Sequence, residues 1–533
     1  MSRWRTFSIF MALLIATIAA VAGIRGIEKR LDDTIETEEL RFTGTVKDAP
    51  PAVAFTSMAL GSFRGLLADI LWLRSETMKS KKNYFELVQL ARWITDLQPN
   101  YSGGTAYLAW NLAYNISVTS SDPEERWYWV NEGIKLIRDK ALIYNPNDPK
   151  LYHELSWIYL HKMGNVLDDA HLYYKNQLAM EMMTIFGAEQ PDWEYLASAP
   201  ATEAEFMKKY PADHRIWQAA RAAGYKSYQA LYDAFRKPIP ADLPQEVKAK
   251  LTVEDAAAIS AAFRARMLRD KLRLDPARMA KLNREYGEMD WRVPESLAIY
   301  WATIGLEKSN GKYVHCRRDI TQALQSAFRS GRLLVIDTGK GAYLQFIPNY
   351  KLASAAYDAF VEAQQYESGG SAESFRSARI NFLKDAIPLL YLNEPREAEK
   401  YFQKLIEEDG PQKQNNVVEF VMKEFAEDVR DGDVEKASAI ISECIYRSLD
   451  KLVAGERKDA VDYNRLAEYI HRKYLAENKD IKRNNLPPFK QMRDSMIDYC
   501  KRMWPREKVA ILNMWLNVEK MEQEKEQKEA KGM

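Results

Sequence analysis

Apolar side chains recur at helical spacing along most of the chain, and Pro-containing segments separate one helical pattern from the next. Residues 97–101 (LQPNY) end one amphipathic pattern, and residues 144–149 (YNPNDP) end the following one. An aromatic-rich helical pattern comes after each, at 106–114 and 151–159. Helix pairs separated by such turns are typical of α-solenoids, a class that mostly binds other molecules. The pattern therefore predicts an all-α fold, an α-solenoid of helical hairpins.

The same pattern predicts how the chain is divided. We expect an N-terminal membrane anchor or signal sequence at 1–24, a spacer at 25–57, a first helical array at 58–187, a helical insertion at 188–285, helices with a β-hairpin at 286–365, a second array at 366–516 and a charged tail at 517–533. Apolar runs on either side of Thr338-Gly339-Lys340-Gly341 predict the hairpin near 333–347. Within the middle of the chain, we expect helices at 253–274 and 276–286, and Asp290 as the cap of a helix with Pro294 in its first turn.

The first residues contain a long uncharged, apolar run. Arg3 and Arg5 precede the segment 6–24, which has no charged side chain and is just long enough to cross a bilayer. A signal peptide cleaved near Ala22 is the alternative. Because a long following domain is translocated largely regardless of local charge, we expect a single-pass inner-membrane protein with its bulk in the periplasm. With cleavage, the same chain becomes a secreted periplasmic protein.

Parts of the chain resemble a degenerate tetratricopeptide repeat. The matching positions are Tyr107, Trp110, Asn111, Tyr114, Ala141 and Pro146; then Tyr152, Leu155, Ser156, Tyr159, Ala170 and Tyr174; and, downstream, Ala398, Phe402, Leu405, Gly432, Ala437, Ile441 and Cys444. The resemblance covers about half of the chain, which is also similar to large N-terminally anchored helical-repeat proteins of bacteria. It implies stacked helical hairpins whose concave groove holds a partner's peptide or helix.

Two sets of groove candidates follow from this resemblance. It places His153, Trp157 and His161 on the concave side of a repeat, with ordinary packing or a surface position as the alternative. Asn111 and Asn115 form a polar pair on an apolar helix and either bind a peptide backbone or join neighbouring repeats. His153 and His161 are about 12 Å apart along a helix, so they cannot share a metal ion.

Composition excludes several kinds of chemistry. The chain has 76 basic and 75 acidic side chains, which gives no field that would attract nucleic acid. Cys316, Cys444 and Cys500 are widely separated and form no metal-binding pattern. Residues 333–339 resemble the strand and Asp-Thr-Gly turn of aspartic proteases, but Lys340 departs from that family and no second copy of the turn exists.

We therefore predict a scaffold or adaptor rather than an enzyme, without cofactor, metal or small-molecule substrate, that binds proteins, among which another copy of the chain is one candidate. The alternatives are a hydrolase whose carboxylates lie on loops, and an accessory subunit of a membrane transporter. The tryptophans at 72, 93, 110 and 157 lie at helical spacing among apolar neighbours, and we expect them in the core.

Overall fold

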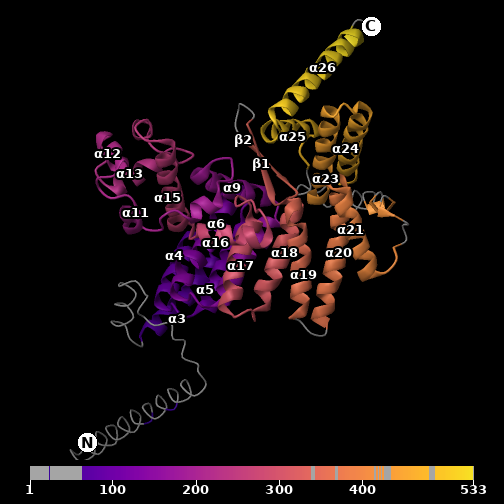
Figure 1. The fold of residues 1–533 in the computed structure, drawn as a ribbon. Helices are drawn as coiled ribbons and strands as arrows, with labels where there is room; N and C mark the ends of the chain where they lie inside the picture. Colours follow the sequence, from indigo (N-terminus) through magenta and orange to yellow (C-terminus); the bar gives the residue numbers. More distant parts are fainter. Residues whose placement is uncertain are drawn as a thin grey trace, which may run out of the picture. The chain divides into compact units, whose positions relative to one another are not determined.

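The computed structural model describes residues 23, 30, 63–337, 342–366, 370–412, 416, 417, 419–421, 423, 424, 434–478 and 486–531. This part of the chain is mostly helical, with one two-stranded sheet (Figure 1), so the predicted all-α class with a minor hairpin is confirmed. Among the described residues, no helix is long and apolar enough to span a bilayer. Apart from Gly23 and Arg30, the predicted anchor and spacer lie outside these residues.

The chain forms two compact units. Unit 1 comprises Met1–Thr105 and Ile143–Pro146, and unit 2 comprises Ala106–Leu142 and Asn147–Met533. In unit 1, α3 (Phe63–Ser80) packs on α4 (Tyr84–Leu97). The two predicted Pro-containing turns meet here, because the Asn145 side-chain amide donates to the Pro99 carbonyl at 2.6 Å.

Unit 2 contains the remaining elements. They are α5 (Ser102–Trp110, which begins in unit 1), η2 (Asn111–Ile116), η3 (Ser117–Thr119), α6 (Pro123–Leu136), η4 (Ile137–Ala141), α7 (Leu142–Tyr144, which ends in unit 1), α8 (Pro149–Trp157), η5 (Ile158–Gly164), α9 (His171–Phe186), α10 (Trp193–Ala197), α11 (Glu203–Lys209), α12 (Arg215–Ala222), α13 (Tyr228–Phe235), α14 (Gln245–Lys248), α15 (Val253–Leu272), α16 (Pro276–Tyr286), α17 (Pro294–Lys308), α18 (Val314–Ser330), β1 (Arg332–Asp337), β2 (Ala342–Ile347), η6 (Tyr350–Leu352), α19 (Ala353–Gln365), α20 (Gly370–Asn393), α21 (Pro395–Asp409), α23 (Val434–Val453), α24 (Arg457–Glu477), α25 (Phe489–Met503) and α26 (Arg506–Lys531).

Three successive helices of the N-terminal region each contain a π-helical stretch. η2 continues α5, η4 continues α6, and η5 continues α8. A π-helix closes its hydrogen bonds one residue further along than an α-helix and is rare, with a preference for functional sites. The hydrophobic periodicity of the sequence does not predict these stretches.

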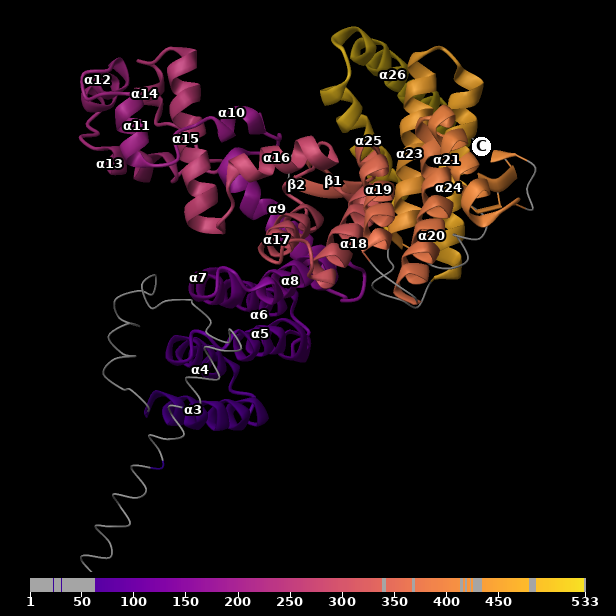
Figure 2. The same ribbon diagram turned by 60° about the horizontal axis from the view of Figure 1, so that its bottom comes forward.

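Helix α17 is buried along most of its length, and it packs against α8, η5 and α18. A Cβ atom added at Gly305 would lie 2.6 Å from Cys316 Sγ and 2.8 Å from Tyr152 Cβ, so only glycine permits α8 and α18 to approach α17 this closely. Beyond α18, each of α19, α20 and α21 packs on the helix before it, and Figure 2 shows them side by side.

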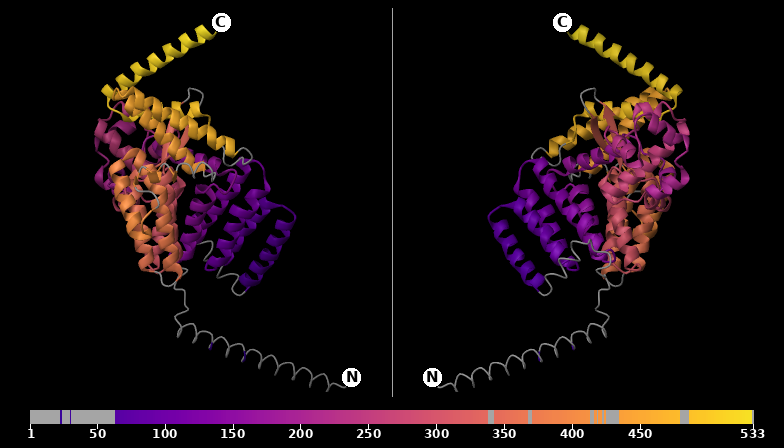
Figure 3. Two further views of the ribbon diagram at one scale, coloured as in Figure 1. Left: turned by 90° about the vertical axis from the view of Figure 1, so that its right-hand side faces the viewer. Right: turned by 90° about the vertical axis from the view of Figure 1, so that its left-hand side faces the viewer.

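The second predicted array has the expected buried positions. Ala398, Phe402 and Leu405 are buried on α21, and Ala437, Ile441 and Cys444 are buried on α23. Gly432, the predicted turn residue, lies outside the described residues. Figure 3 shows α26, which includes most of the predicted charged tail, continuing as a helix beyond α25.

The predicted hairpin is confirmed, with β1 antiparallel to β2 and Leu334 opposite Gln345. Its turn, 338–341, lies outside the described residues. Leu333, Val335 and Leu344 pack with Ala179 of α9 and Val293 in a buried apolar cluster, which seats the hairpin against the start of α17.

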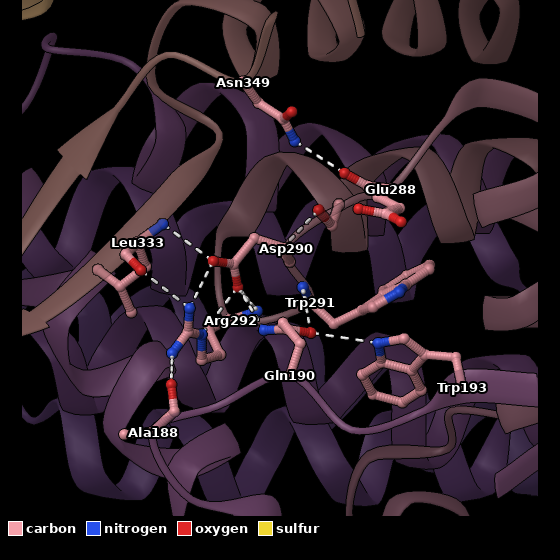
Figure 4. Close-up of polar contacts among 10 residues, drawn as sticks. Ala188, Gln190, Trp193, Glu288, Asp290, Trp291, Arg292, Leu333 and Asn349 are labelled. Atoms are coloured by element: carbon pink, nitrogen blue, oxygen red, sulfur yellow. Dashed lines mark hydrogen bonds and ion pairs between the residues drawn. The ribbon is translucent and has the colours of Figure 1, made fainter. Parts of the chain in front are cut away.

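The sequence predicts that Asp290 caps α17, and this prediction is wrong. The N-cap is Val293, with Pro294 as the first helical residue, while Asp290 is buried and pairs with Arg292 at 2.7 Å (Figure 4). The Asp290 carboxylate accepts from the Leu333 amide at 2.9 Å, and the Arg292 guanidinium donates to the Leu333 carbonyl at 2.9 Å. This clamp satisfies both backbone groups of Leu333 in β1. The predicted helices at 253–274 and 276–286 are confirmed as α15 and α16.

A buried lysine joins three helices of unit 2. Lys175 of α9 lies 2.9 Å from Glu435 of α23 and 3.7 Å from Glu295 of α17. Burial lowers the pKa of Lys175, but the two carboxylates outweigh that effect and raise it above its ordinary value. Lys175 therefore stays charged and holds α9, α17 and α23 to one another.

The clamp gives a prediction about stability. We expect Arg292→Leu to lower the free energy of unfolding by about 3–5 kcal/mol, because it leaves the Asp290 carboxylate buried without its cation. Chemical denaturation followed by far-UV circular dichroism measures the change.

The matched control is Arg284→Leu, which removes an ion pair to Glu194 whose partners are 60% and 62% exposed. Because solvent screens that pair, its loss should cost less than about 1 kcal/mol. Equal losses in the two variants would contradict a stabilising role for the clamp.

Candidate functional site

Seven aromatic and histidine rings form a continuous row across unit 2, which we name the ring row. Its members, in spatial order, are Trp110, Tyr114, His161, Trp157, His153, His315 and Tyr313. Successive ring centroids are 5.6, 5.8, 4.6, 6.1, 5.0 and 5.3 Å apart. These are the distances of rings in contact. The row includes three of the predicted groove residues, His153, Trp157 and His161.

Two pairs of rings stack where an α-helix continues as a π-helix. Trp110 and Tyr114 span the start of η2, and Trp157 and His161 span the start of η5. The interplanar angles are small, 22° for Trp110 with Tyr114 and 16° for Trp157 with His161.

Hydrogen bonds connect the two π-helical stretches. The Tyr114 hydroxyl lies 3.4 Å from His161 Nδ1 and donates to the Trp157 carbonyl at 3.5 Å. Burial and the nearby carboxylates of Glu154 and Asp319 raise the Tyr114 pKa, so its hydroxyl remains protonated. Burial and the Lys162 ammonium lower the pKa of His161, which favours a neutral imidazole.

A buried carboxylate fixes the His153 ring. His153 Nδ1 lies 2.8 Å from Asp319 of α18; the exposed fractions of the two side chains are 18% and 1%. Burial lowers the His153 pKa, but the hydrogen bond and charge of Asp319 outweigh it, and the net shift is upward. Burial raises the pKa of Asp319 to about 6 against the opposing effect of His153. Below the Asp319 pKa, the pair therefore carries one positive charge at the ring row.

Asn111 and Asn115 lie next to the row on η2. The Asn115 amide donates to the Asn111 side-chain oxygen at 2.6 Å, and the Asn111 amide donates to the Tyr107 carbonyl at 3.1 Å. Asn111 is buried and Asn115 is exposed. Both amides thus bond within their own helix, and their role in peptide binding stays a prediction.

Sequence reasoning missed Tyr313 and His315 of the ring row and the Asp319 carboxylate that fixes His153. Asp319, His315 and Tyr313 lie more than 150 positions from His153, and no local pattern connects them to it. Two tryptophans expected in the core are exposed instead, Trp93 at 49% and Trp110 at 39%. Helical spacing predicted that these positions share a face with apolar neighbours, but it could not tell which face the next helix covers.

Groups that could act as nucleophiles near Asp319 are buried. Ser156 donates its hydroxyl to the Ala298 carbonyl at 2.9 Å, and burial raises the pKa of the Cys316 thiol. The other two cysteines are buried as well, with their thiol pKa values raised by burial. In the part of the chain that the structure describes, no group of three or more histidine, cysteine and carboxylate side chains is placed to hold a metal ion.

The basic side chains of α15 are used within the molecule. Arg266 pairs with Asp270 at 3.1 Å and lies 4.0 Å over the Tyr232 ring, and Arg269 pairs with Asp275 at 3.1 Å. These contacts reduce the positive charge available to an external partner.

Comparison with known proteins identifies no relative: no family model, curated protein or solved structure matches this chain.

The His153–Asp319 pair predicts a pH dependence of stability. Both folded pKa values are raised, so the folded state binds these protons more tightly than the unfolded chain does. The resulting stabilisation is complete below the unfolded pKa values, 3.8 for Asp319 and 6.5 for His153, and is lost as pH rises through the folded values.

We expect the wild type to lose stability relative to the double variant His153→Gln/Asp319→Asn as pH rises from 5 to 8, by on the order of 1–3 kcal/mol. Thermal melting of both proteins across this range measures the difference. Parallel pH profiles would show that the pair does not bind its protons more tightly in the folded state.

Proposed function

We propose that this chain is a non-enzymatic scaffold or adaptor that binds an extended segment of a partner protein along the ring row. The helices would form an α-solenoid of tetratricopeptide-like hairpins, in which the row lies on the concave side. The supporting observation is the row itself, which extends over α5–η2, α8–η5 and the start of α18. Repeat proteins use surfaces of this kind, made from several successive helices, to bind extended ligands.

The chemistry of the row suits a peptide. Trp and Tyr rings provide large apolar contact areas, while the Tyr114 hydroxyl and the imidazoles can exchange hydrogen bonds with a peptide backbone. Trp110 is 39% exposed and His315 is exposed, so the two ends of the row reach solvent. Stacking and the Asp319 bond fix the rings in advance, which reduces the entropy cost of binding.

The hydrolase alternative receives less support from this site. His153 and Asp319 resemble the base and orienting acid of a catalytic triad, but such a triad needs a nucleophile within reach of the histidine and of the substrate. Ser156 is fully buried and donates its hydroxyl to a backbone carbonyl, and Cys316 is fully buried too. A binding surface accounts for the arrangement without an exposed nucleophile.

The ring row is tested by capture of partners with matched variants. We expect Trp157→Leu to reduce recovery of a specific partner by about tenfold, because loss of an aromatic anchor costs a kcal/mol or more at a binding hot spot. Full-length protein solubilised in mild detergent is captured, and co-purified proteins are quantified by mass spectrometry.

The control is Tyr469→Ala, which removes an exposed ring from α24. A photoreactive amino acid at position 315 should also cross-link the same partner, whereas one at position 469 should not. Recovery that is insensitive to Trp157→Leu, or cross-links that do not depend on position, would refute binding at the ring row.

We also propose that the apolar segment 6–24 anchors the chain and that its bulk is periplasmic, which a fusion at Met533 tests. Alkaline phosphatase at this end should be active and green fluorescent protein dark. Fluorescence without phosphatase activity would instead favour the alternative of a cytoplasm-facing accessory subunit of a transporter.

A further inference from the structure

The first described helix of unit 1, α3, has an apolar face that no described element of unit 1 covers. Leu66, Ile70 and Leu73 are 58%, 51% and 73% exposed and lie at spacings of four and three residues, which places them in one stripe along the helix. Ala68 and Ser75, on the other side of α3, are buried, and α4 packs against the helix (Figure 2). The outward stripe is therefore distinct from the side of α3 that faces the unit.

Segment 63–82, which contains the stripe, has an excess of basic side chains, five against two acidic ones. Three of them, Lys79, Lys81 and Lys82, follow one another at its C-terminal end, and Lys81 and Lys82 are exposed. An apolar helix face on a net basic segment is typical of helices that lie in the interface of a bilayer and bind anionic lipid.

The position of α3 in the chain favours a membrane over other partners. The uncharged run 6–24 precedes it, and residues 25–62 connect the two. If that run crosses a bilayer, the connecting chain keeps α3 close to the membrane surface, where its effective concentration is high.

We propose that the Leu66–Ile70–Leu73 face of α3 docks on the surface of an anionic lipid bilayer. The leucine and isoleucine side chains enter the boundary between headgroups and acyl chains, and Lys79, Lys81 and Lys82 interact with lipid phosphates. This contact is separate from the ring row, so unit 1 binds lipid whether or not unit 2 binds a peptide.

Fluorescence of labelled full-length protein tests the contact. The native cysteines are all buried, so an introduced exposed cysteine can be labelled selectively with an environment-sensitive dye. We compare Leu73→Cys with Asn100→Cys, an exposed position outside α3, in vesicles of phosphatidylethanolamine and phosphatidylglycerol. Lipids brominated on the upper acyl chain should quench the dye at position 73 about twofold more than at position 100, since a docked helix lies about 5–10 Å deep.

Two further measurements support this comparison. Replacing phosphatidylglycerol with phosphatidylcholine should reduce quenching at position 73, because the lysines lose their anionic partners. The variant Leu66→Gln/Ile70→Gln, made in the Leu73→Cys background, should abolish the excess quenching while leaving the melting temperature nearly unchanged, since both replaced side chains are exposed.

Equal quenching at the two positions would overturn the proposal. Blue-shifted emission at position 73 without quenching would also overturn it, because residues 25–62, a second copy or another protein would then cover the face. Flotation of the full chain with vesicles reports separately on the anchor at 6–24. A chain that floats without quenching at position 73 refutes docking of α3 but not the anchor.

Discussion

A charge removed from water must be paired, and this constraint organises unit 2. Lys175 is fully buried, and its two carboxylate partners come from helices 120 and 260 positions further along the chain. Removing Lys175 would leave both carboxylates without their cation in a low-dielectric interior, which is far more costly than losing an exposed ion pair. The network therefore selects the one arrangement in which α9, α17 and α23 meet, and the Asp290–Arg292 clamp does the same for the hairpin.

Helix α17 connects this buried charge network to the helices of the ring row. Its first turn supplies Glu295 to Lys175, and its last turns include Gly305, where α8 and α18 approach closely. That approach allows His153 on α8 to reach Asp319 on α18. The geometry of the rings thus depends on the buried Lys175 network and on the lack of a side chain at Gly305, although none of these residues belongs to the row.

The sequence predicted local features well and long-range ones poorly. Alternating apolar residues around a Gly-containing turn specified the hairpin, and helical spacing with Pro276 at a helix start specified α15 and α16. Its position before Pro294 predicted that Asp290 caps a helix. In the structure, its carboxylate instead accepts a hydrogen bond from Leu333, which lies 43 positions away. For the candidate site, the spacing of residues along the helix identified His153, Trp157 and His161 but not Asp319. Contacts between helices that are far apart in sequence do not produce a periodic pattern. Trp110 was misplaced for the same reason.

The π-helical stretches have a consequence for how this chain can vary. Each one accommodates more residues per turn than the α-helix that it continues, so removing one residue from η2 or η5 would allow a regular α-helix to form. Two rings on either side of the deleted residue would then be three positions apart instead of four, about 60° out of line on a helix with 3.6 residues per turn, while the flanking helix would keep its orientation. Such a deletion would separate the stacked rings while preserving helix content. Chain length within these turns, and not only side-chain identity, therefore determines whether the ring row exists.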